Sequence, residues 1–316
     1  MINQILGDNN FQYKPTELWA KLPKGISWRE VASVAVGPDQ KVYVFNRGDH
    51  PMIVFDKEGN FLNSWGEDLF VRPHGLTLGL DNSLFCIDDG DHTVRKCSLD
   101  GDVLFTIGSP NNPAEPYSGN PFNRCTDVAI DPKTNDIYVS DGYMNAKIHV
   151  YSPEGKYKFS WGNPGVAPGE FNIPHNIAID KDSYVYVADR ENHRVQIFNS
   201  LGKFEGQWNN IHRPCALYIS RDQEFYVGEL GWGLPVNRAN PNIGPRISVL
   251  DVNGHVLSRI GHLGWGLQEG QFLAPHGITL DIDKNIYLGE VSWTNLNSVN
   301  GKDPGQVRSF QKLIKV

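Results

Sequence analysis

The 316-residue chain combines 32 glycines and 20 prolines with 40% hydrophobic residues, and its net charge is −7. Such frequent turn residues favour many short strands over long helices. The acidic balance argues against a polyanion-binding surface, and no apolar run approaches the roughly 20 residues that span a bilayer. We therefore expect neither nucleic acid nor a membrane as a partner.

The amino-terminal segment and the cysteines bear on the cellular compartment. The sequence starting MINQILGDNNFQYKP has no basic stretch followed by an apolar one, as a secretory signal would. Four cysteines without CxxC spacing are too few for a disulfide scaffold of this size. Both features predict a cytoplasmic location. The oligomeric state is left open by the sequence.

One sequence unit recurs six times along the chain. Its copies start at Val31, Pro73, Cys125, Pro174, Pro214 and Pro275. Apolar residues within a copy alternate with period two, as in Val185-Val187, and turn residues such as Asp180-Lys181-Asp182 separate these runs. Each copy predicts four short antiparallel strands, and six copies predict an all-β fold, a six-bladed β-propeller.

The repeat pattern resembles the NHL repeat over about residues 31–290, most clearly in PHNIAIDKDSYVYVADRENHRVQIF from Pro174. We expect one domain over residues 1–316. The sixth copy ends in QVRSFQKLIKV, before its outer strand, so residues 11–30 are expected to supply that strand and close the last blade.

The innermost strand of each blade lines the channel of a propeller, and here it carries histidine in alternate copies. Aligning the six copies places one residue of each at an equivalent position: Ala32, His74, Thr126, His175, Cys215 and His276. In a six-fold ring the three histidines converge on the axis. Three neutral imidazoles with an open fourth position are typical of catalytic zinc, and a lone packed histidine would not explain the alternation. The sequence predicts a metal site on His74, His175 and His276.

Loops that join the second and third strands are expected to lie near these histidines. Arg47, Tyr143 and Arg190 occupy such loops. Insertions at 109–121, 163–170, 230–246 and 291–305 are expected on the same rim, where a substrate pocket needs walls. Asp88, Asp141 and Asp189 end the second strand at a recurring position and are interpreted as structural turn acids. Glu229 and Glu290 replace that acid, and an inward orientation would place them in the pocket.

The motifs PHG, PHN and PHG, in this order with FNRGDH, VSDGY and ADRENHR, resemble the peptidyl-α-hydroxyglycine α-amidating lyase domain of peptidylglycine α-amidating enzyme. The resemblance implies a six-bladed propeller with zinc on His74, His175 and His276, and active-site roles for Tyr143, Arg47 and Arg190. It also implies a structural calcium held partly by the backbone carbonyls of Val34 and Leu76. Gly277 follows His276, where the family has an aspartate that helps to bind calcium.

This family cleaves the C–N bond of a carbinolamide to give an amide and glyoxylate. By that analogy, zinc binds the substrate hydroxyl, Tyr143 accepts its proton with help from the Arg47 cation, and Arg190 or Arg47 holds a substrate carboxylate. The expected partner is a small molecule or a short acyl-amide.

Two other functions fit the same fold. One is a metal-dependent hydrolase of lactonase or amidase type, which an inward Glu229 and Glu290 would favour. The other is a non-catalytic NHL interaction module, which has no need for histidines on alternate blades.

Overall fold

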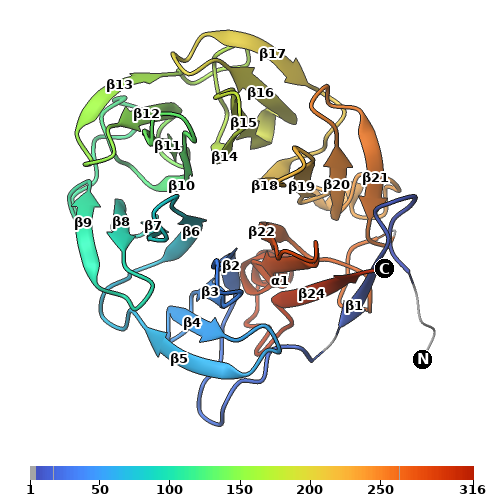
Figure 1. The fold of residues 1–316 in the computed structure, drawn as a ribbon. Helices are drawn as coiled ribbons and strands as arrows, with labels where there is room; N and C mark the ends of the chain where they lie inside the picture. The colour runs from blue at the N-terminus through green and yellow to red at the C-terminus, as the bar shows by residue number, and fades with distance from the viewer. Residues whose placement is uncertain (1–4, 17, 263) are drawn as a thin grey trace. The chain divides into compact units, whose positions relative to one another are not determined.

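The computed structural model describes residues 5–16, 18–262 and 264–316. It contains six four-stranded antiparallel sheets (Figure 1), and five of them follow the chain from the innermost strand to the outermost one. Six such sheets are the blades of a six-bladed β-propeller, which confirms the predicted fold class. The chain divides into two compact units, Asp68–Ile219 and Met1–Glu67 with Ser220–Val316. That the whole chain is one domain stays a prediction.

The unit Asp68–Ile219 holds three complete sheets and the first strand of a fourth. The first sheet has β6 (Pro73–Leu78), β7 (Leu84–Asp88), β8 (Thr93–Cys97) and β9 (Val103–Ile107). The second has β10 (Cys125–Ile130), β11 (Ile137–Asp141), β12 (Lys147–Tyr151) and β13 (Tyr157–Trp161). The third has β14 (Pro174–Ile179), β15 (Val185–Asp189), β16 (Arg194–Phe198) and β17 (Phe204–Trp208), with a 3-10 turn, η1 (Arg190–Asn192), between β15 and β16. Strand β18 (Pro214–Ile219) ends the unit.

The other unit begins and ends the chain. Its first sheet has β2 (Val31–Val36), β3 (Val42–Asn46), β4 (Met52–Phe55) and β5 (Phe61–Trp65). Strands β19 (Phe225–Glu229), β20 (Arg246–Leu250) and β21 (Val256–Ile260) belong to the sheet that starts with β18, and η2 (Pro235–Asn237) lies between β19 and β20. The last sheet has the order β1 (Tyr13–Thr16), β24 (Phe310–Lys315), β23 (Ile286–Glu290) and β22 (Pro275–Leu280).

In this last sheet the outer strand comes from the start of the chain. Strand β1 pairs antiparallel with β24, with Tyr13 opposite Lys315, and therefore covers an edge that β24 alone would expose. The segment 291–305 contains a short helix, α1 (Ser292–Asn300), between β23 and β24. Across the described residues, no helix has the length and apolar character needed to cross a bilayer.

The hydrophobic core within each unit lies between consecutive sheets. Phe85 and Val94 of one blade pack with Val128 and Val139 of the next, and all four are at most 3% exposed. Successive side chains of a strand point to opposite faces, and strands such as β7 and β11 are buried at every residue, so both faces of these strands are covered. Burying one such side chain contributes roughly 1.5–3 kcal/mol.

A β-bulge at the start of the innermost strand positions the residues of the predicted metal layer. In β6, β10, β14 and β22 the register shifts just after the first residue, so that one extra residue stands on the innermost strand. The extra residues include His74, Thr126, His175 and His276. A bulge turns a side chain out of the regular pleat. The backbone thus gives these positions a direction that a regular strand would not.

Candidate metal centre

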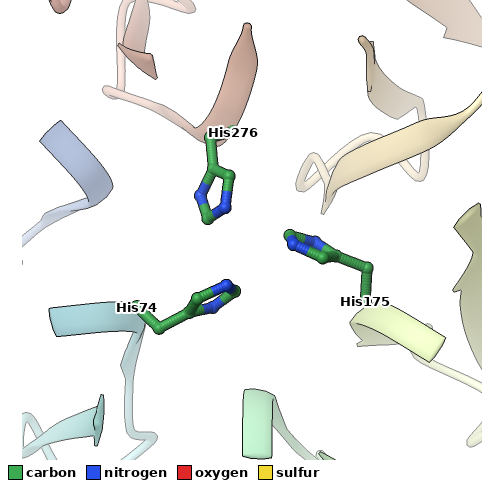
Figure 2. Close-up of side chains that lie close together, drawn as sticks. All are labelled: His74, His175 and His276. Carbon is green, nitrogen blue, oxygen red and sulfur yellow. The ribbon is translucent and has the colours of Figure 1, made fainter. Parts of the chain in front are cut away.

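The side chains of His74, His175 and His276 lie close together (Figure 2). Each offers one ring nitrogen, and these atoms lie within 4.8 Å of one another. All three side chains are buried, with at most 4% exposed. The sequence placed these three residues at equivalent positions, and the structure brings them together.

The Nδ1 atoms of the three histidines all face acceptors. His74 Nδ1 lies 2.7 Å from the carbonyl oxygen of Thr126, and His276 Nδ1 lies 2.7 Å from that of Ala32. His175 Nδ1 lies 2.7 Å from Asn176 Oδ1 and 3.0 Å from the carbonyl oxygen of Cys215. A carbonyl oxygen only accepts, so each Nδ1 carries the proton and each Nε2 keeps its lone pair. This tautomer is the one that binds a metal through Nε2, and the donor set fits zinc.

The charge state of His175 also suits a ligand. Burial, with a further contribution from the Arg190 cation, lowers the pKa of His175 to about 3. The imidazole is therefore neutral at physiological pH. A neutral imidazole binds a cation, whereas a protonated one repels it.

Tyr143 lies against two of the histidines. Its Oη is 3.0 Å from His74 Nε2 and 3.1 Å from His175 Nε2. Its ring lies beneath two guanidinium groups, with the Cζ of Arg124 4.5 Å and that of Arg190 5.5 Å from the ring centroid. The phenol thus stands between the metal ligands and two cations.

Arg190 is held by an ionic cluster. Its Nε donates to Glu191 Oε1 at 2.8 Å, and Arg213 Nη2 donates to the same oxygen at 2.8 Å. Burial alone would lower the pKa of Arg190, but the interactions with Tyr143, Cys215 and Glu191 raise it above its ordinary value. Despite burial, the Arg213 and Arg190 cations hold the pKa of Glu191 at about 2. The cluster keeps its charges over the physiological pH range.

Arg47 has a different partner. Its Nη1 donates to Glu30 Oε1 at 2.7 Å, and both side chains are almost fully buried. The other oxygen of Glu30 accepts from the backbone N–H of Thr294 at 2.7 Å. These contacts anchor the loop that carries Arg47. Its predicted action on Tyr143 stays a prediction.

The carboxylates that end the second strands are structural. Asp88 accepts from the backbone N–H of Arg72 at 2.9 Å, and Asp189 accepts from that of Asn172 at 2.7 Å. Glu290 does the same for Leu273 at 2.7 Å. Glu229 accepts from Arg246 Nε at 2.8 Å. Glu290 thus takes over the turn-acid role, whereas Glu229 binds the Arg246 and Ser248 side chains of β20.

The predicted calcium site lacks one of its expected ligands. A Cβ on Gly277 would lie 2.5 Å from Ser33 Cα and 2.9 Å from the Ala32 carbonyl oxygen, so this backbone leaves no space for an aspartate there. Val34 and Leu76 are paired within their strands, opposite Val44 and Cys86. Their role as calcium ligands through backbone carbonyls stays a prediction.

Sequence reasoning missed three polar residues around the histidines. Asn176 accepts from His175, and its Nδ2 donates to Asp127 Oδ2 at 2.8 Å. Burial raises the pKa of Asp127 to about 7, although hydrogen bonds from Val128, Ile177 and Asn176 oppose this. Arg124 stands closer to the Tyr143 ring than Arg190 does. Their repeat positions alone gave no sign of these contacts, because the contacts depend on side-chain direction and, for Asn176 and Asp127, on the neighbouring blade.

A cavity of about 320 Å³ adjoins the segment that carries Tyr143. Residues of two predicted insertions line it, among them Tyr117, Pro164 and Val166, together with Gly142. The insertions at 109–121 and 163–170 therefore form walls of a hollow, as expected of loops around a binding site.

Comparisons with known proteins connect this arrangement to a family. An NHL repeat model matches residues 171–198. Peptidyl-glycine alpha-amidating monooxygenase A of Xenopus laevis is 31% identical over 304 residues, which cover 83% of this chain and 30% of that protein. Peptidyl-alpha-hydroxyglycine alpha-amidating lyase 1 of Drosophila melanogaster is 32% identical over 252 residues, which cover 74% and 45%. NHL repeat-containing protein 3 of Homo sapiens is 30% identical over 224 residues, which cover 66% and 64%.

Solved structures share the fold at low identity. Virginiamycin B lyase from Staphylococcus aureus superposes with a TM-score of 0.58 at 16% identity, covering 97% of this chain and 88% of that one. The gluconolactonase XC5397 from Xanthomonas campestris superposes with a TM-score of 0.58 at 9% identity, covering 91% and 87%. At such identities the likeness extends to the fold alone.

The fold and the histidine cluster define an NHL-repeat β-propeller with residues able to hold a metal. The chain is a homologue of the peptidylglycine α-amidating monooxygenases and the peptidyl-α-hydroxyglycine α-amidating lyases, at about 30% identity. It spans less than half the length of these relatives.

Proposed function

We propose that the chain is a metal-dependent carbon–nitrogen lyase that converts an N-acyl- or peptidyl-α-hydroxyglycine into an amide and glyoxylate. The observation that carries the proposal is the position of Tyr143, whose Oη lies within 3.1 Å of the Nε2 atoms of both His74 and His175. A proton acceptor beside three metal ligands is the arrangement that breakdown of a carbinolamide requires. The homology to proteins named as amidating lyases supports the same reaction.

The metal proposed for His74, His175 and His276 is zinc. Three neutral imidazoles suit this ion and leave a fourth position for an oxygen ligand. Zinc, when bound, supplies Lewis-acid activation of the substrate hydroxyl. Buried walls around the cluster strengthen that effect, because electrostatic interactions are larger where water is excluded.

Tyr143 acts on protons in this proposal. Its phenolate, stabilised by the Arg124 and Arg190 cations, accepts the hydroxyl proton of the substrate. The carbon–oxygen bond becomes a carbonyl as the carbon–nitrogen bond breaks, and the electron pair goes to the amide nitrogen. The proton on Tyr143 then returns to that nitrogen, so the products are a neutral amide and glyoxylate.

Arg190 is proposed to hold the glycine carboxylate of the substrate. It is a permanent cation beside Tyr143, and its guanidinium matches a carboxylate with two parallel hydrogen bonds. Glu191 and Arg213 fix its position. Arg47 is proposed as the second cation of this site.

The proposed partner is a short acyl-amide, and nucleic acid or membrane is not part of the proposal. The cytoplasmic location and a structural calcium stay predictions.

The test combines metal analysis with an activity assay. Purified protein is expected to contain about one zinc per chain and to release glyoxylate from N-acetyl-α-hydroxyglycine, with both properties lost in His175→Ala. Zinc without glyoxylate release would refute the lyase reaction. Absence of both would leave the interaction module that the NHL repeats also fit. The hydrolase alternative, which an inward Glu229 and Glu290 would favour, gains no support from these two residues, because their oxygens bind neighbouring segments.

A further inference from the structure

Two arginines share one buried carboxylate beside Tyr143. Asp89 Oδ2 accepts from Arg72 Nη1 at 2.5 Å, and from Arg124 Nη2 at 2.6 Å and Nε at 3.1 Å. Arg124 in turn lies 4.5 Å from the centre of the Tyr143 ring. We call Arg72, Asp89 and Arg124 the Arg–Asp–Arg cluster. It lies within the unit Asp68–Ile219, next to the residues of the proposed reaction.

The charges in this cluster do not balance. One carboxylate faces two guanidinium groups, and its Oδ1 is buried without a hydrogen-bond partner among the described residues. Asp89 is fully buried, whereas the Arg72 and Arg124 side chains are 34% and 35% exposed. Each guanidinium has five N–H donors, and the contacts with Asp89 use three of the ten. The cluster therefore presents positive charge and hydrogen-bond donors to solvent from a fixed position.

Backbone contacts hold the cluster in place. The N–H of Asp89 donates to the Arg72 carbonyl oxygen at 3.2 Å, and the N–H of Arg124 donates to His92 Nδ1 at 3.0 Å. The N–H of Tyr143 lies 3.4 Å from the Arg124 carbonyl oxygen. The two arginines and the tyrosine thus belong to one connected set of segments. Because these donors are already held in place, an anion that binds them loses little free energy to the ordering of side chains.

The preceding repeat of the sequence shows what a purely structural pair looks like. Glu30 and Arg47 occupy the same two repeat positions as Arg72 and Asp89, with the charges exchanged, and the backbone contact between them is the same. There, one acid meets one arginine, and both side chains are almost fully buried. Anchoring a loop therefore needs neither a second arginine nor exposure. The Arg–Asp–Arg cluster, by contrast, has a second arginine, and both of its arginine side chains are partly exposed.

We infer that the Arg–Asp–Arg cluster is a specificity subsite that binds an anionic group on the acyl part of the substrate, such as an acidic side chain or a dicarboxylic acyl group. The inference rests on the proposed function. In that proposal Arg190, which is only 12% exposed, takes the glycine carboxylate. Arg124 lies on the same phenol, and the Arg72 and Arg124 side chains are nearer to solvent than that of Arg190, so we place them against the portion of the substrate that extends outward. Guanidinium groups recognise a carboxylate by charge and by paired hydrogen bonds.

The test measures binding directly, independently of turnover. Calorimetry compares N-succinylglycine with its neutral isostere N-succinamoylglycine, neither of which can be cleaved for lack of a hydroxyl. The native protein is expected to bind the acidic ligand about tenfold more tightly, and Arg124→Gln or Arg72→Gln to abolish this preference. Arg221→Gln, at an exposed arginine outside the cluster, is the matched control and is expected to keep it.

The outcomes separate the subsite from the reaction. Equal binding of both ligands by the native protein, or an unchanged preference in both cluster variants with native thermal unfolding, would overturn the subsite. The hydroxylated versions of the two ligands are then assayed for glyoxylate. A cluster-dependent binding preference without glyoxylate release supports the subsite and refutes the lyase reaction. Glyoxylate release at equal rates, without any binding preference, supports the reaction and refutes the subsite.

Discussion

The innermost strands of the six sheets form two groups that use the same position differently. In β6, β14 and β22 the position holds a histidine, whereas in β2, β10 and β18 it holds Ala32, Thr126 or Cys215. Each histidine donates its Nδ1–H to the backbone carbonyl of a residue in the second group. One group thus supplies the metal ligands and the other orients them. Because a backbone carbonyl orients each histidine, the side chain at this position of the second group can differ from blade to blade.

The largest expected effect comes from removing a ligand. His175→Ala leaves two imidazoles, which do not retain zinc, so metal content measured by atomic emission is expected to fall from about one per chain to near zero. His193→Asn is the matched control, because His193 contacts His212 outside the cluster. Equal zinc in His175→Ala and the native protein would exclude the cluster as the metal site.

Tyr143→Phe removes the proton acceptor and leaves the ligands. Glyoxylate release is expected to fall at least 100-fold with an unchanged metal content. Tyr157→Phe, at an exposed tyrosine of the outer strand β13, is expected to behave like the native protein. Native turnover in Tyr143→Phe would contradict its assignment as the base.

Asn176→Ala tests His175, whose Nδ1 has a side-chain acceptor in addition to a carbonyl. Loss of the 2.7 Å contact with His175 is expected to weaken zinc binding about tenfold in competition with a chelator. The Cys215 carbonyl still fixes the tautomer, so the effect is smaller than that of His175→Ala. An unchanged affinity would show that the carbonyl alone suffices.

Asp127→Asn tests a carboxylate on a strand of the second group. Its pKa is raised from 3.8 to about 7 by burial, so the folded state binds a proton more tightly than the unfolded state. Stability is therefore lost as pH rises from about 4 to about 7. Between pH 5 and pH 8 the native protein is expected to lose roughly 2–3 kcal/mol more than Asp127→Asn in urea unfolding. Parallel pH profiles would contradict this.

Cys215→Ala is expected to have the smallest effect. Its carbonyl remains, and Ala32 already occupies the equivalent position beside His276. Zinc affinity is expected to stay within about twofold of the native value. A large loss would mean that the Cys215 thiol, 3.5 Å from His175 Nδ1, takes part in orienting the ligand.

The sequence by itself determined the six repeats, the strand pattern and the three histidines at one position of alternate copies. These follow from period-two alternation and from the alignment of copies, which are local properties. The positions of the polar partners were decided by tertiary structure. The carbonyl that orients His74 is 52 residues away on the next blade, and Arg124 reaches Asp89 over 35 residues. For Glu229 and Glu290, likewise, the sequence indicates an acid but does not indicate which segment that acid binds. Side-chain direction at these positions depends on the bulges and on the neighbouring blade, and neither is a property of one repeat alone.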